Sequence, residues 1–211
     1  MRSVSEDNGI SILTYGDKRI YSVGISTGGR AEMRMAAADP NRRIIATTID
    51  PAGFLFAKEQ IEQAGLSNRI EVKIENISSP LPYPDGSFDY IYARLVLHYL
   101  PKLDLIQALG ELYRILKIGG KMFVVVRSAE CPVTRNRNSH YDPDNRMTTY
   151  TFQGTTYSRY FHSEDSIQQY LASSGFRIQY AKSYPERLCV DFERMQQASQ
   201  EDTLIEVLAY K

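Results

Sequence analysis

The sequence predicts an α/β fold in which a mostly parallel sheet is covered by helices on both sides. Short apolar strands alternate with helical segments over the first 127 residues, which is typical of such a sheet. The run at residues 121–126 is continuously apolar, as expected of a parallel strand buried on both faces. A cluster of glycines directly follows the first of these strands, so the sheet opens with a strand, a glycine turn and a helix.

The elements follow from periodicity and from the residues that end them. Strands are predicted at residues 19–23, 44–49, 70–74, 88–93 and 121–126. Helices are predicted at residues 28–38, over about a dozen residues from Ala52 to the stop at Gly65, and at residues 103–116. The segment 78–87 is rich in Pro, Gly and Ser and is predicted to be a loop.

The character of the chain changes after Arg127. Residues 128–161 are polar, rich in Arg, Asn, Ser, Thr and Tyr, and show no clear period, so we expect a lid or substrate-binding region. A surface excursion without a role is the alternative. Ser163 is predicted to cap a helix that reaches about residue 174 and stops at Gly175. Residues 176–181 and 203–210 are predicted to pair as an antiparallel hairpin.

The bulk composition favours one soluble domain. A chain of 211 residues has the size of one domain, here 1–211. Lys+Arg and Asp+Glu both number 25, which argues against a chain that coats nucleic acid or an anionic membrane. Cys131 and Cys189 are expected to be reduced thiols. Neither a membrane span nor a signal peptide is visible, so we expect a cytoplasmic protein.

The glycine turn and Asp50 together indicate a nucleoside site. Glycines let the backbone approach a ligand closely, and Asp50, at the end of the second strand, can accept hydrogen bonds from ribose hydroxyls. Taken alone, Asp50 is better explained as the N-cap of a helix that begins at Pro51; together with the glycine turn, the ribose role is favoured. The dinucleotide fingerprint fails because Ser26 stands between Gly24 and Gly28, where a second glycine belongs. A nicotinamide dehydrogenase is therefore disfavoured.

Four segments in this order resemble one known family. They are Ser-Val-Gly-Ile-Ser-Thr-Gly-Gly (22–29), Thr-Ile-Asp-Pro (48–51), Leu-Pro-Tyr-Pro-Asp-Gly-Ser-Phe-Asp-Tyr-Ile-Tyr-Ala-Arg-Leu-Val-Leu-His-Tyr-Leu (81–100) and Glu-Leu-Tyr-Arg-Ile-Leu-Lys-Ile-Gly-Gly-Lys (111–121). Together they resemble the class I S-adenosylmethionine-dependent methyltransferases of small molecules. The resemblance implies a three-layer Rossmann-like, doubly wound sheet of seven strands in the order 3-2-1-4-5-7-6, with the last strand antiparallel.

The resemblance also implies which residues bind the cofactor S-adenosylmethionine. The glycine turn would lie against the methionine part, Asp50 would bind the ribose, residues 76–77 would lie beside the adenine and residues 94–95 would approach the sulfonium. The full set is Gly24, Ser26, Thr27, Gly28, Asp50, Pro51, Asn76, Ile77, Arg94 and Leu95.

The sequence departs from the family at several places. Ser22 stands where the family often has an acid, Ser26 replaces the middle glycine, and Asn76 replaces the acid near the adenine amine. The N-terminal segment 1–18 is short, where the family commonly has one or two helices over the cofactor, and a partner subunit in a homodimer is one way to supply that cover. These departures leave open an alternative function, a noncatalytic regulatory or scaffold protein with a weakened cofactor site.

The expected reaction moves a methyl group to an O, N or C atom of a small-molecule acceptor bound beneath residues 128–161. Nucleic acid and membrane partners are disfavoured by the balanced charge. His98 is the candidate catalytic base because it shortly follows the fourth strand and titrates near neutrality; a packed histidine is the alternative. His140 with Asp142 and Asp144 fits a solvated turn better than a metal site, so no metal is predicted.

Overall fold

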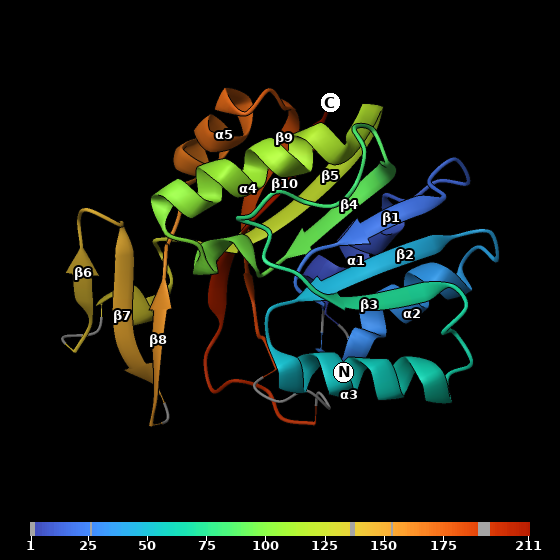
Figure 1. Ribbon diagram of the computed structural model, residues 1–211. Coiled ribbons are helices and arrows are strands. Elements are labelled where there is room, and N and C mark those ends of the chain that lie inside the picture. Colours follow the sequence, from blue (N-terminus) through green and yellow to red (C-terminus); the bar gives the residue numbers. More distant parts are fainter. Residues whose placement is uncertain (1–2, 26, 136–137, 153, 190–194) are drawn as a thin grey trace.

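The computed structural model describes residues 3–25, 27–135, 138–152, 154–189 and 195–211. Its centre is a seven-stranded sheet in the order β3-β2-β1-β4-β5-β10-β9 (Figure 1). The strands are β1 (Arg19–Ser22), β2 (Arg43–Thr48), β3 (Ile70–Ile74), β4 (Phe88–Arg94), β5 (Leu116–Arg127), β9 (Arg177–Glu186) and β10 (Asp202–Tyr210). Counted along the chain, this is the predicted order 3-2-1-4-5-7-6.

The directions of the strands also agree with the prediction. The five strands β1 to β5 pair in parallel, whereas β10 is antiparallel to β5 and to β9, with Val207 opposite Val124 and Ala181. The chain winds outward from β1 to β3 and then crosses to β4, so the winding reverses between β1 and β4. In open α/β sheets a ligand binds at this switch point, outside the carboxyl ends of the strands.

Helices cover both faces of the sheet (Figure 1). One face carries α4 (Lys102–Ile115) and α5 (Glu164–Ser173), and the other carries α1 (Val4–Ser11), α2 (Arg30–Ala37) and α3 (Pro51–Gln63). The predicted start of α5 is confirmed, since Ser163 and Ser166 form a reciprocal capping box. Every helix in the described part of the chain is too short or too polar to span a bilayer.

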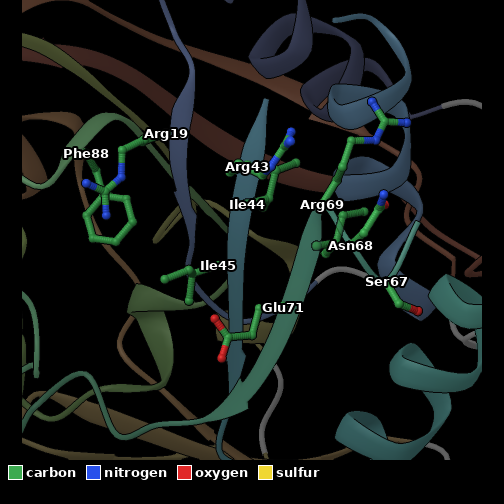
Figure 2. A pocket seen from close by; sticks show the side chains of 10 residues that line it. Arg19, Arg43, Ile44, Ile45, Ser67, Asn68, Arg69, Glu71 and Phe88 are labelled. Atoms are coloured by element: carbon green, nitrogen blue, oxygen red, sulfur yellow. The ribbon is translucent and has the colours of Figure 1, made fainter. Parts of the chain in front are cut away.

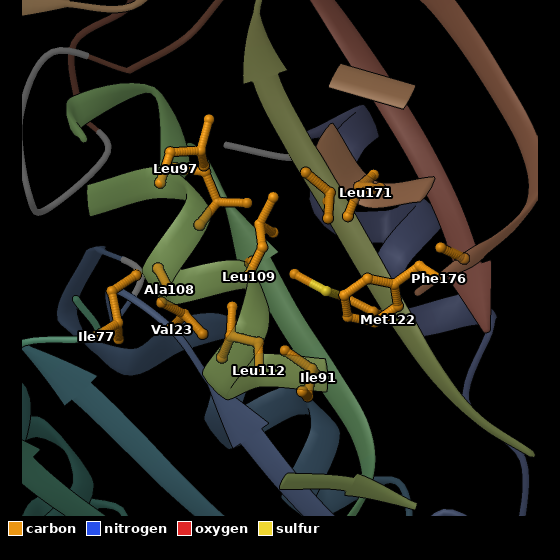
Figure 3. Packing of buried hydrophobic residues seen from close by; sticks show 14 of the residues in the cluster. Val23, Ile77, Ile91, Leu97, Ala108, Leu109, Leu112, Met122, Leu171 and Phe176 are labelled. Atoms are coloured by element: carbon orange, nitrogen blue, oxygen red, sulfur yellow. The ribbon is translucent and has the colours of Figure 1, made fainter. Parts of the chain in front are cut away.

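The larger apolar core lies under α4 and α5. Leu109 and Leu112, on the inner side of α4, pack towards Ile91 of β4 and Met122 of β5 (Figure 3). All four side chains are fully buried. The helix presents this stripe because apolar residues recur every three or four positions along it. The carboxyl end of β4 is thereby held against a rigid layer.

The N-terminal segment forms a helix, α1, that packs on the sheet. Ser3 caps it by accepting a hydrogen bond from the amide of Glu6 (3.3 Å). Gly9 lies directly against the sheet, because a Cβ there would be 2.6 Å from the ring of Tyr92 and 2.7 Å from that of Phe123. The N-terminal segment thus contains a helix that packs on one face of the sheet.

The polar region after β5 contains a second sheet, which the sequence analysis missed. It is antiparallel and consists of β6 (His140–Asp142), β7 (Met147–Phe152) and β8 (Thr155–Arg159). No strand was predicted in this region, and that part of the sequence analysis is therefore wrong. Threonine and tyrosine favour strands because their branched or aromatic side chains suit a pleated surface. The small sheet stands beyond the carboxyl ends of β2, β4 and β5 (Figure 1).

Candidate functional site

The glycine turn after β1 has a backbone that only glycine adopts easily. Gly24, Gly28 and Gly29 all have positive φ, at 68°, 62° and 73°. Thr27 to Gly29 form a short 3-10 turn, so α2 begins at Arg30, two residues later than predicted. Ser26, one of the predicted cofactor residues, lies outside the described residues. The left-handed backbone explains why glycine recurs in this turn.

Close packing is a second reason for glycine at two of these positions. A Cβ on Gly24 would be 2.6 Å from Cγ2 of Val96, and one on Gly28 would be 2.9 Å from the ring of Phe56. The amide of Ile25 donates to the carbonyl of Thr47 (2.6 Å), which ties the turn to β2. The turn is thus held between α3 and the segment that follows β4, at the switch point of the sheet.

Asp50 lies exposed at the carboxyl end of β2 and caps α3. Its two carboxylate oxygens accept hydrogen bonds from the amides of Ala52 (3.0 Å) and Gly53 (3.1 Å), and Pro51 is the first helical residue. The cap that the sequence analysis held as an alternative is therefore present. Each oxygen accepts one of these bonds, and a carboxylate oxygen has a further lone pair, so the cap leaves capacity for another donor.

The predicted adenine contacts lie after β3. Asn76 is exposed, and its side-chain oxygen accepts from the amide of Ser78 (3.0 Å). The Ile77 side chain is 5% exposed and belongs to the core under α4, so that side chain faces the core. The neighbouring Glu75 carboxylate accepts from the buried phenol of Tyr21 (2.9 Å) and from Tyr83 (2.6 Å). Burial and the nearby carboxylate raise the pKa of both phenols.

Arg94 is the last residue of β4, and Leu95 directly follows it. The Arg94 guanidinium donates to the hydroxyls of Ser5 (2.7 Å) and Ser3 (2.8 Å), and its Nη2 lies 3.6 Å from Oε1 of Glu186. Arg94 therefore anchors α1 and the end of β9. Leu95 has a φ of 57°, which is strained for a residue with a side chain. Such strain is concentrated at functional sites. The left-handed backbone at Leu95 turns the chain so that the next residue, Val96, packs against Gly24.

A buried carboxylate that the sequence analysis did not select lies beside the start of the glycine turn. Ser22, at the end of β1, donates its hydroxyl to Oε1 of Glu32 on α2 (2.5 Å). Both side chains have no exposed surface. Ser22 stands where the resembling family often has an acid, and Glu32 places a carboxyl group beside that position from another element. Position alone could not reveal this, since the two residues are ten apart in sequence.

His98 lies in the short 3-10 turn η2 (Leu97–Tyr99) and is 1% exposed. Burial, and then the charges of Arg127, Arg159 and His162, hold its pKa well below the ordinary value. Its Nδ1 has no hydrogen-bond partner among the described residues. The ring packs against Tyr99 with centroids 4.6 Å apart. His98 is thus a packed histidine, and its lowered pKa favours the neutral ring.

The other candidates from the sequence lie in β6 and the turn that follows it, and directly before the cap of α5. Asp142 accepts from the amide of Asp144 (3.0 Å) and from the side chain of Asn145 (2.9 Å), as in a solvated turn. Within the described ranges, no three or more of the His, Cys, Asp and Glu side chains are grouped to hold a metal ion. His162 lies before the cap of α5 with no exposed surface.

A pocket of about 360 Å³ lies at the other edge of the sheet (Figure 2). It is lined by the first residues of four strands, Arg19, Arg43, Ile70 and Phe88. This is the amino edge, opposite to the glycine turn and to Asp50. Ligands of doubly wound sheets bind outside the carboxyl ends of the strands. We therefore assign the candidate site to that side of the sheet, where the glycine turn and Asp50 lie.

Comparison with known proteins shows what the chain is similar to. The sequence profile of the family described as "Methyltransferase domain" matches residues 22–124. The demethylmenaquinone methyltransferase of Thermus thermophilus is 32% identical over 108 residues, covering 51% of this chain and 46% of the relative. A sterol 4-C-methyltransferase of Caenorhabditis elegans is 28% identical over 119 residues, covering 56% of this chain and 34% of the relative. The matches thus span half or less of these relatives.

A solved structure extends the likeness to nearly the whole chain. An S-adenosylmethionine-dependent methyltransferase from Methanosarcina mazei superposes with a TM-score of 0.71, covering 95% of each chain at 19% sequence identity. At that identity the likeness shows the fold. Residues 22–124 are thus similar in sequence to a methyltransferase domain, and the described chain shares its sheet order and overall fold with this methyltransferase structure.

Proposed function

We propose that the protein is an enzyme that transfers the methyl group of S-adenosylmethionine to a cyclic small molecule. The observation that carries this proposal is the placement of the left-handed glycine turn and Asp50 on neighbouring strands at the switch point of the sheet. The names of the two relatives, for demethylmenaquinone and for a sterol, support a cyclic acceptor. They also favour carbon among the possible acceptor atoms.

The residues at the carboxyl edge fit this cofactor. The glycine turn has no side chain at Gly24 or Gly28, and a Cβ at either would collide with its neighbours, so at these two positions only backbone faces a ligand. Asp50 retains lone pairs for the ribose hydroxyls while it caps α3. In this proposal Pro51 and the backbone of residues 76–77 form the rest of the surface that contacts the nucleoside.

Glu32 provides the negative charge for the amino group of the methionine part. It is buried against Ser22 at the first turn of α2, next to the glycine turn. A carboxylate in a region of low dielectric attracts a cation more strongly than one in water does. In this proposal Ser22 positions Glu32 by its hydrogen bond, and the pair replaces the acid that the family often carries on the strand itself.

The acceptor binds between the segment after β4 and the small sheet. The cofactor supplies a methyl group on a positively charged sulfur, so the work of the protein is to align the acceptor and to exclude water. The strained Leu95 and the Val96 side chain, packed against Gly24, direct residues 97–99 towards the small sheet. His98 is the candidate base at this place, but its lowered pKa makes it a weak base, so the site suits an acceptor whose hydroxyl is acidic.

A noncatalytic role is the second candidate, and one observation favours it. Asp50 and Asn76 both already make local hydrogen bonds, to the start of α3 and to the loop after β3. In a noncatalytic protein these hydrogen bonds would stabilise the local structure, and the two residues would bind no cofactor. The two functions differ in one property, which is the affinity for the nucleoside.

Calorimetric titration with S-adenosylhomocysteine separates the two functions. We expect one site per chain with a dissociation constant in about the micromolar range. No heat of binding up to millimolar ligand would contradict the enzyme. Incubation with methyl-labelled S-adenosylmethionine and a panel of quinols and phenols then tests transfer, with label expected in an organic-soluble product of the wild-type protein and lost in Asp50→Ala.

A further inference from the structure

One face of the small sheet carries an arginine among tyrosines. Tyr150 on β7 lies directly opposite Tyr157 on β8, and Arg159 follows two residues later on the same face of β8. Tyr150 packs with Cys131, Val133 and Phe161 in a small apolar cluster. The paired side chains of the other face are the polar Thr149 with Ser158 and Thr151 with Thr156. The arginine is therefore on the inner, apolar face.

Arg159 is enclosed by three aromatic rings. It is 7% exposed. Its guanidinium donates to the phenol of Tyr150 through Nη1 and to that of Tyr99 through Nη2, the latter at 2.9 Å. Its central carbon lies 4.6 Å from the ring centre of Tyr157, 5.1 Å from that of Tyr99 and 5.6 Å from that of Tyr150. The Nε atom is buried and has no hydrogen-bond partner among the described residues.

The positive charge of Arg159 has no carboxylate beside it. None of the ion pairs within the described residues includes Arg159, whereas the nearby Arg127 pairs with Asp202 at 2.5 Å. A guanidinium does not lose its proton in proteins. Burial raises the pKa of Tyr150, so that phenol is neutral at pH 7. An uncompensated buried cation is costly, and such groups are concentrated at sites that bind charge.

Two buried histidines accompany this arginine. His98 and His162 are 1% and 0% exposed, and each has one ring nitrogen without a partner in the described part of the chain, Nδ1 and Nε2 respectively. Burial lowers the pKa of His162 to about 3 and that of His98 well below its ordinary value. Both rings are neutral at pH 7 and are available for hydrogen bonding to a ligand.

This group of side chains adjoins the proposed cofactor site. His98 and Tyr99 belong to η2, which follows Leu95 and the Val96 that packs against Gly24. The amide of Tyr160, the residue after Arg159, donates to the carbonyl of His98 (2.7 Å). Tyr99 is 47% exposed, so the group reaches the surface at its ring. An acceptor that enters beside Tyr99 meets Arg159 and His98 on the side where the methyl group is expected.

We propose that Arg159 binds the anionic oxygen of the methyl acceptor, which is an aromatic or enolic hydroxyl compound that binds ionised. This inference rests on the proposed function. The tyrosine rings stack on the planar part of the acceptor, and the Arg159 Nε donates to its oxygen. Ionisation places electron density on the oxygen and on the conjugated carbons, which are the atoms that attack a methyl group. Arg159 thus selects acceptors by acidity as well as by shape.

The test uses 4-nitrophenol, whose phenolate absorbs visible light, with wild-type protein saturated with S-adenosylhomocysteine. We expect the bound probe to be more ionised than the free probe at the same pH, and Arg159→Gln to weaken phenolate binding at least about tenfold. The matched control is Arg135→Gln, which removes an exposed arginine of the same region and is expected to change nothing. An unshifted probe, or a shift that survives in Arg159→Gln, would overturn the proposal.

Further experiments distinguish a failure of this proposal from a folding defect and from a failure of the proposed function. Arg159→Lys keeps the charge but removes the Nε donor, so we expect a smaller shift; a folded Arg159→Lys protein with the full wild-type shift would count against the proposal. Thermal unfolding of Arg159→Gln without ligand should show no loss of stability, whereas a purely structural arginine would leave a destabilised protein. Benzoate that displaces the probe and binds more tightly would refute the hydroxyl class. If S-adenosylhomocysteine binds and the probe does not, this inference fails alone; if the nucleoside does not bind, the proposed function fails.

Discussion

Replacing Asp50 by alanine separates its two roles. The substitution removes both cap bonds to α3, at 3.0 and 3.1 Å, which costs about 1 kcal/mol of folding free energy. For a domain of this size that lowers the unfolding temperature by roughly 2–4 °C. The same substitution removes the proposed charge-assisted bonds to the ribose, which are together worth about 1.5–3 kcal/mol. Every 1.4 kcal/mol is about tenfold, so S-adenosylhomocysteine should bind roughly 10- to 150-fold more weakly.

Ser163→Ala is the matched control for the cap. Ser163 caps α5, on the other face of the sheet, through the same kind of side-chain bond to a helix amide (3.1 Å). We expect both variants to lower the unfolding temperature similarly in calorimetric scans, while only Asp50→Ala changes the affinity in titration calorimetry. If Asp50→Ala is destabilised but binds the nucleoside as the wild type does, Asp50 is a helix cap and the ribose role is refuted.

Three further variants test other parts of the account. Gly24→Ala should abolish nucleoside binding and should lose more stability in denaturant unfolding than Gly65→Ala. Both glycines have positive φ, but only a Cβ at Gly24 would lie 2.6 Å from a neighbour. Equal losses of stability in the two variants would contradict the close packing. Glu32→Gln should weaken S-adenosylhomocysteine binding about tenfold in calorimetry, and unchanged affinity would exclude the proposed charge contact. His162 has a folded pKa of about 3 against an ordinary 6.5, so the unfolded chain binds more protons between these values and stability falls as pH falls below 6.5, by up to about 1.4 kcal/mol per pH unit. His162→Gln should flatten this dependence in unfolding measured from pH 7 to 4, and the exposed His140→Gln should not.

The main sheet could be predicted because its signals are local. The strand at residues 70–74 is found at the predicted residues, and α4 and α5 lie within one residue of their predicted ends. Apolar periodicity and cap residues such as Ser163 determine these elements without reference to the rest of the chain. The strand order came from the resemblance, since pairing between distant strands leaves no comparable local pattern.

The small sheet was missed because its strands are not apolar. Its two longer strands, Met147–Phe152 and Thr155–Arg159, consist largely of threonine, tyrosine and serine, and their short turns contain Gly154 and the left-handed Arg146. The signal was present as a high strand propensity on both sides of a glycine turn. Its inner face can be recognised only once the sheet is seen to pack against residues 97–99.

The place of a candidate residue was predictable where it depends on local sequence alone, as for Asp50 between β2 and α3. It was not predictable where a group is supplied from another element. Glu32 reaches Ser22 from the next helix, and Arg159 meets Tyr99 across 60 residues of sequence. Arg94 was expected near the sulfonium, but its guanidinium is bound to Ser3 and Ser5 of the N-terminal segment. Such contacts depend on tertiary packing, which spacing along the chain does not reveal.

A crystal structure of the protein grown with S-adenosylhomocysteine tests the central claim most directly. The account predicts the nucleoside at the carboxyl edge of the sheet, with its ribose hydroxyls on the Asp50 carboxylate and its methionine part against the turn at Gly24. A ligand bound instead in the pocket beside Arg19 and Arg43, at the amino edge, would contradict it.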